Sequence, residues 1–282
     1  RTEVVRRQTL FKHLRTLGEV AVAEDEVSVV NLRTSGWVER LRVQRTGEPV
    51  RRGQVLLELY SPELVAAQEY LLLARRTAGP DSPLAASARR RLELMGIAPG
   101  DVTAVEARGE ASRTLPIRAP SGGYVLDKGV VEGSRVTAGA DLYRIGDLQR
   151  VWVEAEVYEF DAPWVEEGQP AQMDLPFQDG TVLAGQVAHI YPTLNPTTRT
   201  LRVRLEFENP GVRLKPGMFA TVRIQYRRKE GVVAVPAEAI LRTGERSLVF
   251  VAQGRGRFVP REVRTGLIAD RHRVEILEGL TP

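Results

Sequence analysis

The side chains that could do chemistry in this sequence are carboxylates, histidines, methionines and arginines, because the 282 residues contain no cysteine. Paired carboxylates can act as general acid and base, and Glu154, Glu156 and Glu159 lie close together in the chain. Their spacing is better explained by the solvent-facing side of a β-strand. The lack of cysteine excludes disulfides and thiolate metal sites, and it suits an oxidising compartment.

Histidines and methionines are too scattered to indicate a metal site. Metal-binding histidines usually recur at short spacings, and ordinary packing explains these better, although a fold could gather some of them. A nucleophile elbow, a phosphate loop and a zinc-protease motif are all missing. We therefore expect no enzyme, no catalytic or cofactor-binding residue and no identifiable metal site. The scattered residues are His13, His189, His272, Met95, Met173 and Met218.

Five arginines, in contrast, gather in one stretch that has helical periodicity. They are Arg75, Arg76, Arg89, Arg90 and Arg91. A solvated charged face is one interpretation, and docking to an acidic partner is the other, so these five are our candidate partner-contact residues. The nearby run Leu71-Leu72-Leu73 is broader than a single apolar stripe needs. It indicates either helical core or a contact face for another protein.

Composition narrows the classes of partner. The net charge is only +4, aromatic residues make up 6% and the many arginines are dispersed, whereas a nucleic-acid surface needs a concentrated basic stripe with stacking aromatics. No apolar run approaches the ~20 residues of a membrane span, and no signal peptide is visible. Because the chain opens on Arg1-Thr2-Glu3, we expect any export signal or anchor to lie outside it.

A duplicated pattern is the strongest internal signal. Ser35-Gly36, Gly47 and Gly53 recur as Ser121-Gly122, Gly133 and Gly139, each pair offset by the same 86 residues. Apolar residues follow in both copies at matched places. Each copy predicts a compact strand–turn–strand unit whose glycines supply positive φ. Because one unit cannot bury its apolar face alone, we expect the two to pack as one small β-sandwich.

Between the copies lies a segment with helix signals. Ser61 is a good N-cap and Pro62 a good first helical residue, and Ser82-Pro83 repeats this start after the break at 78–81. Apolar residues recur at helical spacing in both arms. They are Leu64, Ala67, Leu71 and Ala74 in the first and Leu84, Ala88, Leu92 and Met95 in the second. The segment predicts an α-hairpin, with a short third helix after Pro99.

From Val151 onward the pattern predicts strands only. Val151, Val153, Ala155 and Val157 alternate with polar or aromatic residues, and short strands bounded by Gly or Pro follow at 171–175, 185–190, 200–207 and 219–226. This spacing is typical of a small antiparallel barrel. Residues 195–200 indicate a turn leading into a strand, and Pro216-Gly217 fits the centre of a type II turn.

Several segments together resemble the periplasmic adaptor subunits, or membrane fusion proteins, of resistance-nodulation-division (RND) efflux pumps, in particular their heavy-metal branch (copper/silver, cobalt/zinc/cadmium). The similar segments lie in the family's order and cover nearly the whole chain. They are Leu59-Tyr60-Ser61-Pro62-Glu63-Leu64, Ile145-Gly146-Asp147-Leu148 with Val151-Trp152-Val153, Thr198-Arg199-Thr200 with Leu214-Lys215-Pro216-Gly217-Met218-Phe219, and Val235-Pro236 with Ala239-Ile240.

The resemblance implies a mainly β, elongated multidomain protein with an inserted α-hairpin. The implied modules are a membrane-proximal β domain (1–12 plus 231–282), a β-barrel (13–25 plus 150–230), a lipoyl-like β-sandwich or barrel-sandwich hybrid (26–60 plus 115–149) and the α-helical hairpin (61–114). It also implies a periplasmic location at the inner membrane. The implied partners are an RND transporter, an outer-membrane channel and further copies in a ring, often of six.

The implied function is mechanical bridging of transporter and channel for heavy-metal ion export, with no cofactor beyond transient metal-ion binding at a site that the sequence does not identify. A drug-efflux adaptor of the same family is the near alternative. A lipoyl-like carrier or enzyme subunit would need a modifiable lysine between the half-motifs, and no lysine lies between Pro49 and Arg118. A secreted glycan-binding protein would need an aromatic-rich groove, which three tryptophans scarcely provide.

Overall fold

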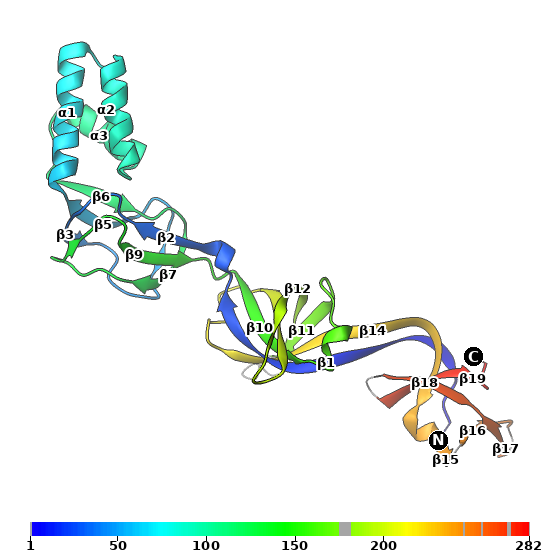
Figure 1. Ribbon diagram of the computed structural model, residues 1–282. Coiled ribbons are helices and arrows are strands. Elements are labelled where there is room, and N and C mark those ends of the chain that lie inside the picture. Colours follow the sequence, from blue (N-terminus) through cyan, green and yellow to red (C-terminus); the bar gives the residue numbers. More distant parts are fainter. Residues whose placement is uncertain (1, 175–181, 245, 255, 270–271, 282) are drawn as a thin grey trace. The chain divides into compact units, whose positions relative to one another are not determined.

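The computed structural model describes residues 2–174, 182–244, 246–254, 256–269 and 272–281. The chain divides into two compact units (Figure 1). One is Val22–Arg150, and the other combines Arg1–Ala21 with Val151–Pro282. No helix among the described residues has the length and apolar content that a membrane span requires.

The Val22–Arg150 unit contains a β-sandwich made of two four-stranded sheets, with strand orders β2-β9-β7-β4 and β6-β5-β3-β8. Each sheet takes strands from both copies of the duplicated pattern, and the inward residues form one hydrophobic cluster. The prediction that the copies fold together is therefore confirmed. The strands are β2 (Val27–Asn31), β3 (Gly36–Leu41), β4 (Pro49–Val50), β5 (Val55–Tyr60), β6 (Thr114–Arg118), β7 (Gly123–Lys128), β8 (Arg135–Val136) and β9 (Asp141–Gly146).

The two copies are not in the single register that the sequence predicts. A Cβ on Gly36 would lie 2.3 Å from the Tyr60 carbonyl oxygen, and one on Gly123 would lie 2.4 Å from the equivalent oxygen of Gly146. The structural partner of Gly36 is thus Gly123, at an offset of 87, and not Gly122. The offset returns to 86 at the turns, where Gly47 and Gly133 donate equivalent hydrogen bonds.

One inserted residue accounts for this change of register. Val43 and Val130 are both buried at equivalent places with the offset of 87. The carbonyls of Arg45 and Val131 accept equivalent hydrogen bonds from Glu48 and Ser134, at the offset of 86. Gln44 is therefore the additional residue of the first copy. A comparison of the two copies by sequence does not reveal this additional residue, because Gly122 stands directly before Gly123 and can be matched with Gly36 at the offset of 86.

Tyr143 is the largest side chain buried in the sandwich core. It is 1% exposed, and its hydroxyl donates a 2.8 Å hydrogen bond to the Val43 carbonyl. Burial raises the pKa of this hydroxyl from 10.0 to about 12, and the Glu48 carboxylate adds to the rise. The unfolded chain therefore loses this proton at lower pH than the folded chain does.

We expect this tyrosine to make the unit less stable above pH 10. The protonated hydroxyl stabilises the folded unit fully at pH values below the pKa of this tyrosine in the unfolded chain. This contribution to the free energy of unfolding falls as pH rises toward 12, by about 3 kcal/mol at most. Tyr143→Phe removes the titrating group, so the difference in free energy of unfolding between the wild type and the variant should shrink across this range. Urea unfolding at a series of pH values measures it. Parallel pH profiles for the two proteins would contradict the assignment.

Three helices leave the sandwich between β5 and β6: α1 (Pro62–Ala78), α2 (Pro83–Leu94) and α3 (Pro99–Arg108). The predicted starts are confirmed, since the Ser61 and Ser82 hydroxyls accept hydrogen bonds from the backbone N–H groups of Leu64 and Ala85. The apolar stripe of α2 differs from the prediction. Ala85 is buried there in place of Leu84, which is 42% exposed.

The other unit contains a closed barrel of six strands in the order β1-β10-β13-β12-β11-β14, completed by the pairing of β1 with β14 (Figure 1). Val151, Val153, Ala155 and Val157 point into its core, as their alternation predicts. The predicted strand 171–175 is present as far as Asp174, and Leu175 lies outside the described residues. The barrel strands are β1 (Arg6–Val22), β10 (Arg150–Tyr158), β11 (Pro170–Asp174), β12 (Val182–Asn195), β13 (Thr200–Glu208) and β14 (Phe219–Pro236).

Both predicted turns are found. Asn195 Oδ1 accepts hydrogen bonds from the N–H groups of Thr197 and Thr198 ahead of β13. Gly217 has φ +86° and Met218 N–H donates to the Lys215 carbonyl, which is a type II turn. Beyond the barrel, β14 also pairs with β19 (Arg273–Glu278), which pairs with β18 (Arg264–Ala269). A separate three-stranded sheet is made of β15 (Ile240–Thr243), β16 (Arg246–Ala252) and β17 (Phe258–Glu262).

Candidate partner-contact surface

The helical hairpin is fixed to the sandwich by buried polar contacts at its base. The Thr34 hydroxyl donates to the Glu63 carboxylate at 2.6 Å and lies 3.3 Å from the hydroxyl of the N-cap Ser61. Thr34 and Ser61 are 2% and 0% exposed. Hydrogen bonds in such a dry environment are strong and costly to break, so the first turn of α1 is held firmly on the sheet.

Gln68 adds a second link, between α1 and the returning chain. Its side-chain amide donates to the carbonyls of Leu64 and Ser112, and its carbonyl accepts from Ser112 N–H at 3.0 Å. The residue is fully buried. A glutamine on the apolar stripe of a helix was the available sequence signal for this contact, because a buried amide requires partners.

The third link joins α3 to the sheet. Arg118 of β6 binds the Asp101 carboxylate with two hydrogen bonds of 2.7 Å and donates a third to the Gly53 carbonyl. The bond to Asp101 raises the pKa of the Arg118 guanidinium further above its usual value. This bidentate geometry fixes the orientation of both side chains. No sequence pattern indicates this pairing, because Asp101 and Arg118 lie on different elements.

The five candidate arginines fall into two groups. Arg75 and Arg89 both form ion pairs with Glu106 of α3, whose side chain is only 6% exposed. Through this shared carboxylate the two arginines tie α1 and α2 to α3. Arg76, Arg90 and Arg91 are exposed, and Arg76 donates a hydrogen bond to the Gly109 carbonyl. The structure therefore brings two of the five together and leaves the other three on the surface.

Exposed apolar side chains accompany these arginines on the hairpin. Leu71 and Leu72 are buried, whereas Leu73 is 57% exposed and Tyr70 is 44% exposed. The leucine run is thus mostly helical core, with one leucine on the surface. The hairpin presents a mixed apolar and cationic surface, and such composition is common in protein interfaces.

The clustered carboxylates of the barrel take part in surface contacts. Glu154 accepts a hydrogen bond from the Tyr191 hydroxyl and forms an ion pair with Arg202. Glu156 accepts from the Thr200 hydroxyl at 3.1 Å. Within the described ranges, no group of three or more His, Cys, Asp or Glu side chains is arranged to hold a metal ion.

Three protein-family models match this chain in consecutive segments. Residues 27–146 match the CusB barrel-sandwich hybrid domain, residues 150–228 the CusB-like β-barrel domain, and residues 233–282 the CzcB C-terminal circularly permuted SH3-like domain. The first segment contains the sandwich with its helical hairpin, and the second contains most of the barrel.

Similar curated proteins include the cation efflux system protein CzcB of Alcaligenes sp. (strain CT14), 32% identical over 94% of this chain and 55% of its own length. Others are the cation efflux system protein CusB of Escherichia coli O157:H7, 28% identical over 86% and 60%, and the putative membrane fusion protein SilB of Salmonella typhimurium, 26% identical over 93% and 61%. The chain thus spans a little over half the length of these relatives.

Solved structures share the fold. MacA from Actinobacillus actinomycetemcomitans superposes with a TM-score of 0.60, at 20% identity, over 100% of this chain and 97% of its own. ZneB from Cupriavidus metallidurans gives a TM-score of 0.51, at 24% identity, over 99% and 89%.

Proposed function

Because the chain is built from CusB/CzcB-family membrane fusion protein domains, we propose that it is the periplasmic adaptor of a metal-ion efflux pump. In this role it joins an inner-membrane RND transporter to an outer-membrane channel. The work is mechanical: the protein seals the gap between the two and transmits the transporter's cycle to the channel. No reaction is catalysed.

One observation carries the proposal. The chain carries, in order, a barrel-sandwich hybrid with a helical hairpin inserted between its two halves, a β-barrel and an SH3-like domain, and the models that match them are those of CusB and CzcB. The proposed modules are the hairpin (61–114), the lipoyl-like domain (26–60 plus 115–149), the barrel (13–25 plus 150–230) and the membrane-proximal domain (1–12 plus 231–282). The hairpin contacts the channel, the barrel and terminal strands contact the transporter, and several copies, six in our proposal, form a ring.

The exported ions are the proposed substrates, since the similar CusB and CzcB are named cation efflux proteins. A host that lacks its own metal adaptors, given this protein together with an RND transporter and an outer-membrane channel of a metal efflux system, tests this. We expect growth in copper, silver, zinc, cobalt or cadmium at concentrations that stop the host. Resistance to drugs with none to metals would favour a drug-efflux adaptor of the same family.

We further propose that the surface arginines of the hairpin make the contact with the channel, while Arg75 and Arg89 position α3 through Glu106. Reversing Arg90 and Arg91 to Glu should lower co-purification of the channel about tenfold or more, because like charges across an interface are repulsive. The same reversal at Arg242 and Arg246, two exposed arginines outside the hairpin, is the matched control. Equal losses for both double variants would contradict the assignment.

A further inference from the structure

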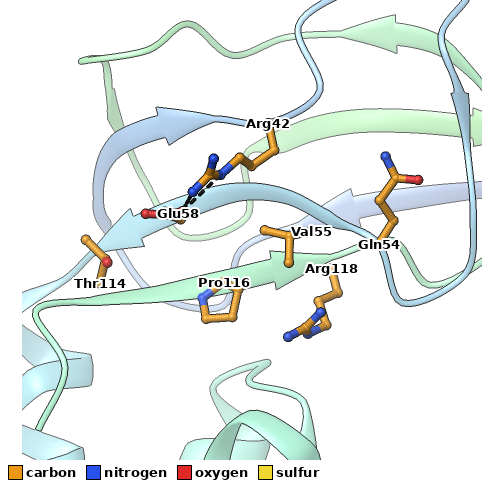
Figure 2. A pocket seen from close by; sticks show the side chains of 7 residues that line it. All are labelled: Arg42, Gln54, Val55, Glu58, Thr114, Pro116 and Arg118. Atoms are coloured by element: carbon orange, nitrogen blue, oxygen red, sulfur yellow. Dashed lines mark hydrogen bonds and ion pairs between the residues drawn. The ribbon is translucent and has the colours of Figure 1, made fainter.

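A second group of arginines lies on the sandwich and not on the helical hairpin. The six arginines of this group belong to β3, to the turns on either side of β4, and to β6, and we call the group the arginine edge. Three of the six line two neighbouring hollows of about 500 and 440 Å³: Arg42 is shared by both, Arg118 lines the first and Arg45 lines the second. Figure 2 shows the larger hollow, with Arg42 and Arg118 on its two sides and Thr114 and Gln54 at its ends. The members are Arg40, Arg42, Arg45, Arg51, Arg52 and Arg118.

The duplicated half of the sandwich shows that the turns do not require three of these arginines. Arg45, Arg51 and Arg52 occupy the places of Val131, Thr137 and Ala138 in the second copy, as the equivalent turn hydrogen bonds establish. Both copies form the same turns, with Gly47 and Gly133 at φ of +82° and +80°. The turns of the first copy therefore do not depend on this charge.

Nearby carboxylates offset only part of this charge. Glu58 forms an ion pair with Arg42, and Asp101 forms one with Arg118. Glu48 accepts hydrogen bonds from the backbone N–H groups of Gln44 and Arg45. Glu132 accepts a 2.8 Å hydrogen bond from the Leu41 N–H, between Arg40 and Arg42. Six guanidinium groups thus stand against four carboxylates, so the edge attracts anions and repels metal cations. It is therefore unsuited to the proposed exported ions.

We propose that the arginine edge binds a phosphate-bearing ligand with at least two phosphoryl groups. Guanidinium groups bind phosphate through paired, charge-assisted hydrogen bonds. Two hollows that share one arginine suit two successive anionic groups, and Thr46 and Thr114 line the hollows with hydroxyl donors. A free polyphosphate and a row of phospholipid headgroups both carry this chemistry.

The second copy of the motif supplies the variant for the test. Replacing Arg45 by Val, Arg51 by Thr and Arg52 by Ala gives the first copy the residues with which the second already folds. Binding of tripolyphosphate is measured by calorimetry on the full chain, at low and high salt, with thermal unfolding as the check of folding. We expect the triple variant to bind at least about tenfold more weakly, and wild-type binding to weaken with salt.

A triple variant with the same loss of charge, Arg242→Gln, Arg246→Gln and Arg257→Gln, is the control and should bind tripolyphosphate as the wild type does. Vesicles of phosphatidylglycerol in phosphatidylcholine distinguish the sources: binding to them that tripolyphosphate displaces supports headgroups, and binding of tripolyphosphate alone supports a free ligand. Equal binding by the wild type and the edge variant would overturn the proposal. So would an equal loss in the control, or tighter binding of polyglutamate than of tripolyphosphate.

Discussion

Replacing residues 61–113 by a two-residue Asn-Gly turn should give a protein whose sandwich folds but which supports no metal resistance. Tyr60 and Thr114 are directly opposite each other at the ends of the antiparallel strands β5 and β6. A two-residue type I′ turn joins such ends without changing their register. The inward residues of all eight strands remain, including Val38, Leu59 and Ile145, each fully buried.

Some loss of stability is expected, because helix residues such as Leu64 and Val102 belong to the same hydrophobic cluster as the sandwich. Removing this contact uncovers apolar surface, and each large side chain exposed costs about 2 kcal/mol. All three helices must be removed together. A cut after α2 alone would leave α3 with Glu106 deprived of Arg75 and Arg89, and a poorly solvated charge without its partners destabilises strongly.

Circular dichroism and thermal unfolding would establish the fold of the shortened protein, and growth in toxic metal would measure its function. Our proposal also predicts which partner is lost. The transporter should still co-purify, because the barrel and terminal strands are intact, whereas the channel should not. Full resistance with the shortened protein would show that the hairpin is not the bridging element.

Sequence patterns were sufficient for the parts of the fold that depend on local rules. Ser61-Pro62 and Ser82-Pro83 begin helices because a hydroxyl cap and a proline suit the first turn wherever it occurs. Val151 to Val157 alternate because one face of a strand must be buried. In both cases the signal depends only on neighbouring residues, so contacts between distant elements do not change the local structure that it predicts.

Contacts between distant elements were not accessible in this way. The interaction of Arg75 and Arg89 with Glu106 depends on where α3 lies against the other two helices, and no spacing along the chain encodes that. The same is true of Thr34 beneath Glu63. Leu84 and Ala85 lie four and three residues before the buried Ala88, so helical periodicity allows either on the apolar stripe, and the structure buries Ala85. The two positions differ by about 100° around the helix.

The duplicated motif illustrates the same limit, and it leads to a prediction with a large effect. Gly123→Ala should destabilise the sandwich by about 3 kcal/mol or more, because a new Cβ would lie 2.4 Å from the backbone oxygen of Gly146 and the residue has φ +142°. A backbone oxygen in a paired strand cannot move aside as the end of a flexible side chain can. Gly36→Ala should act similarly, through the Tyr60 oxygen.

Gly122→Ala is the matched control, one residue away. A Cβ there would lie 3.6 Å from its nearest neighbour, which is ordinary contact, so its effect on the free energy of unfolding should stay within about 1 kcal/mol. Urea unfolding of the three variants compares them directly. The single offset of 86 makes Gly122 the partner of Gly36, whereas the structure makes Gly123 the partner, so a larger loss for Gly122→Ala than for Gly123→Ala would contradict the structural register. The opposite order would support the register in which Gly123 is the partner of Gly36 and Gln44 is the additional residue of the first copy.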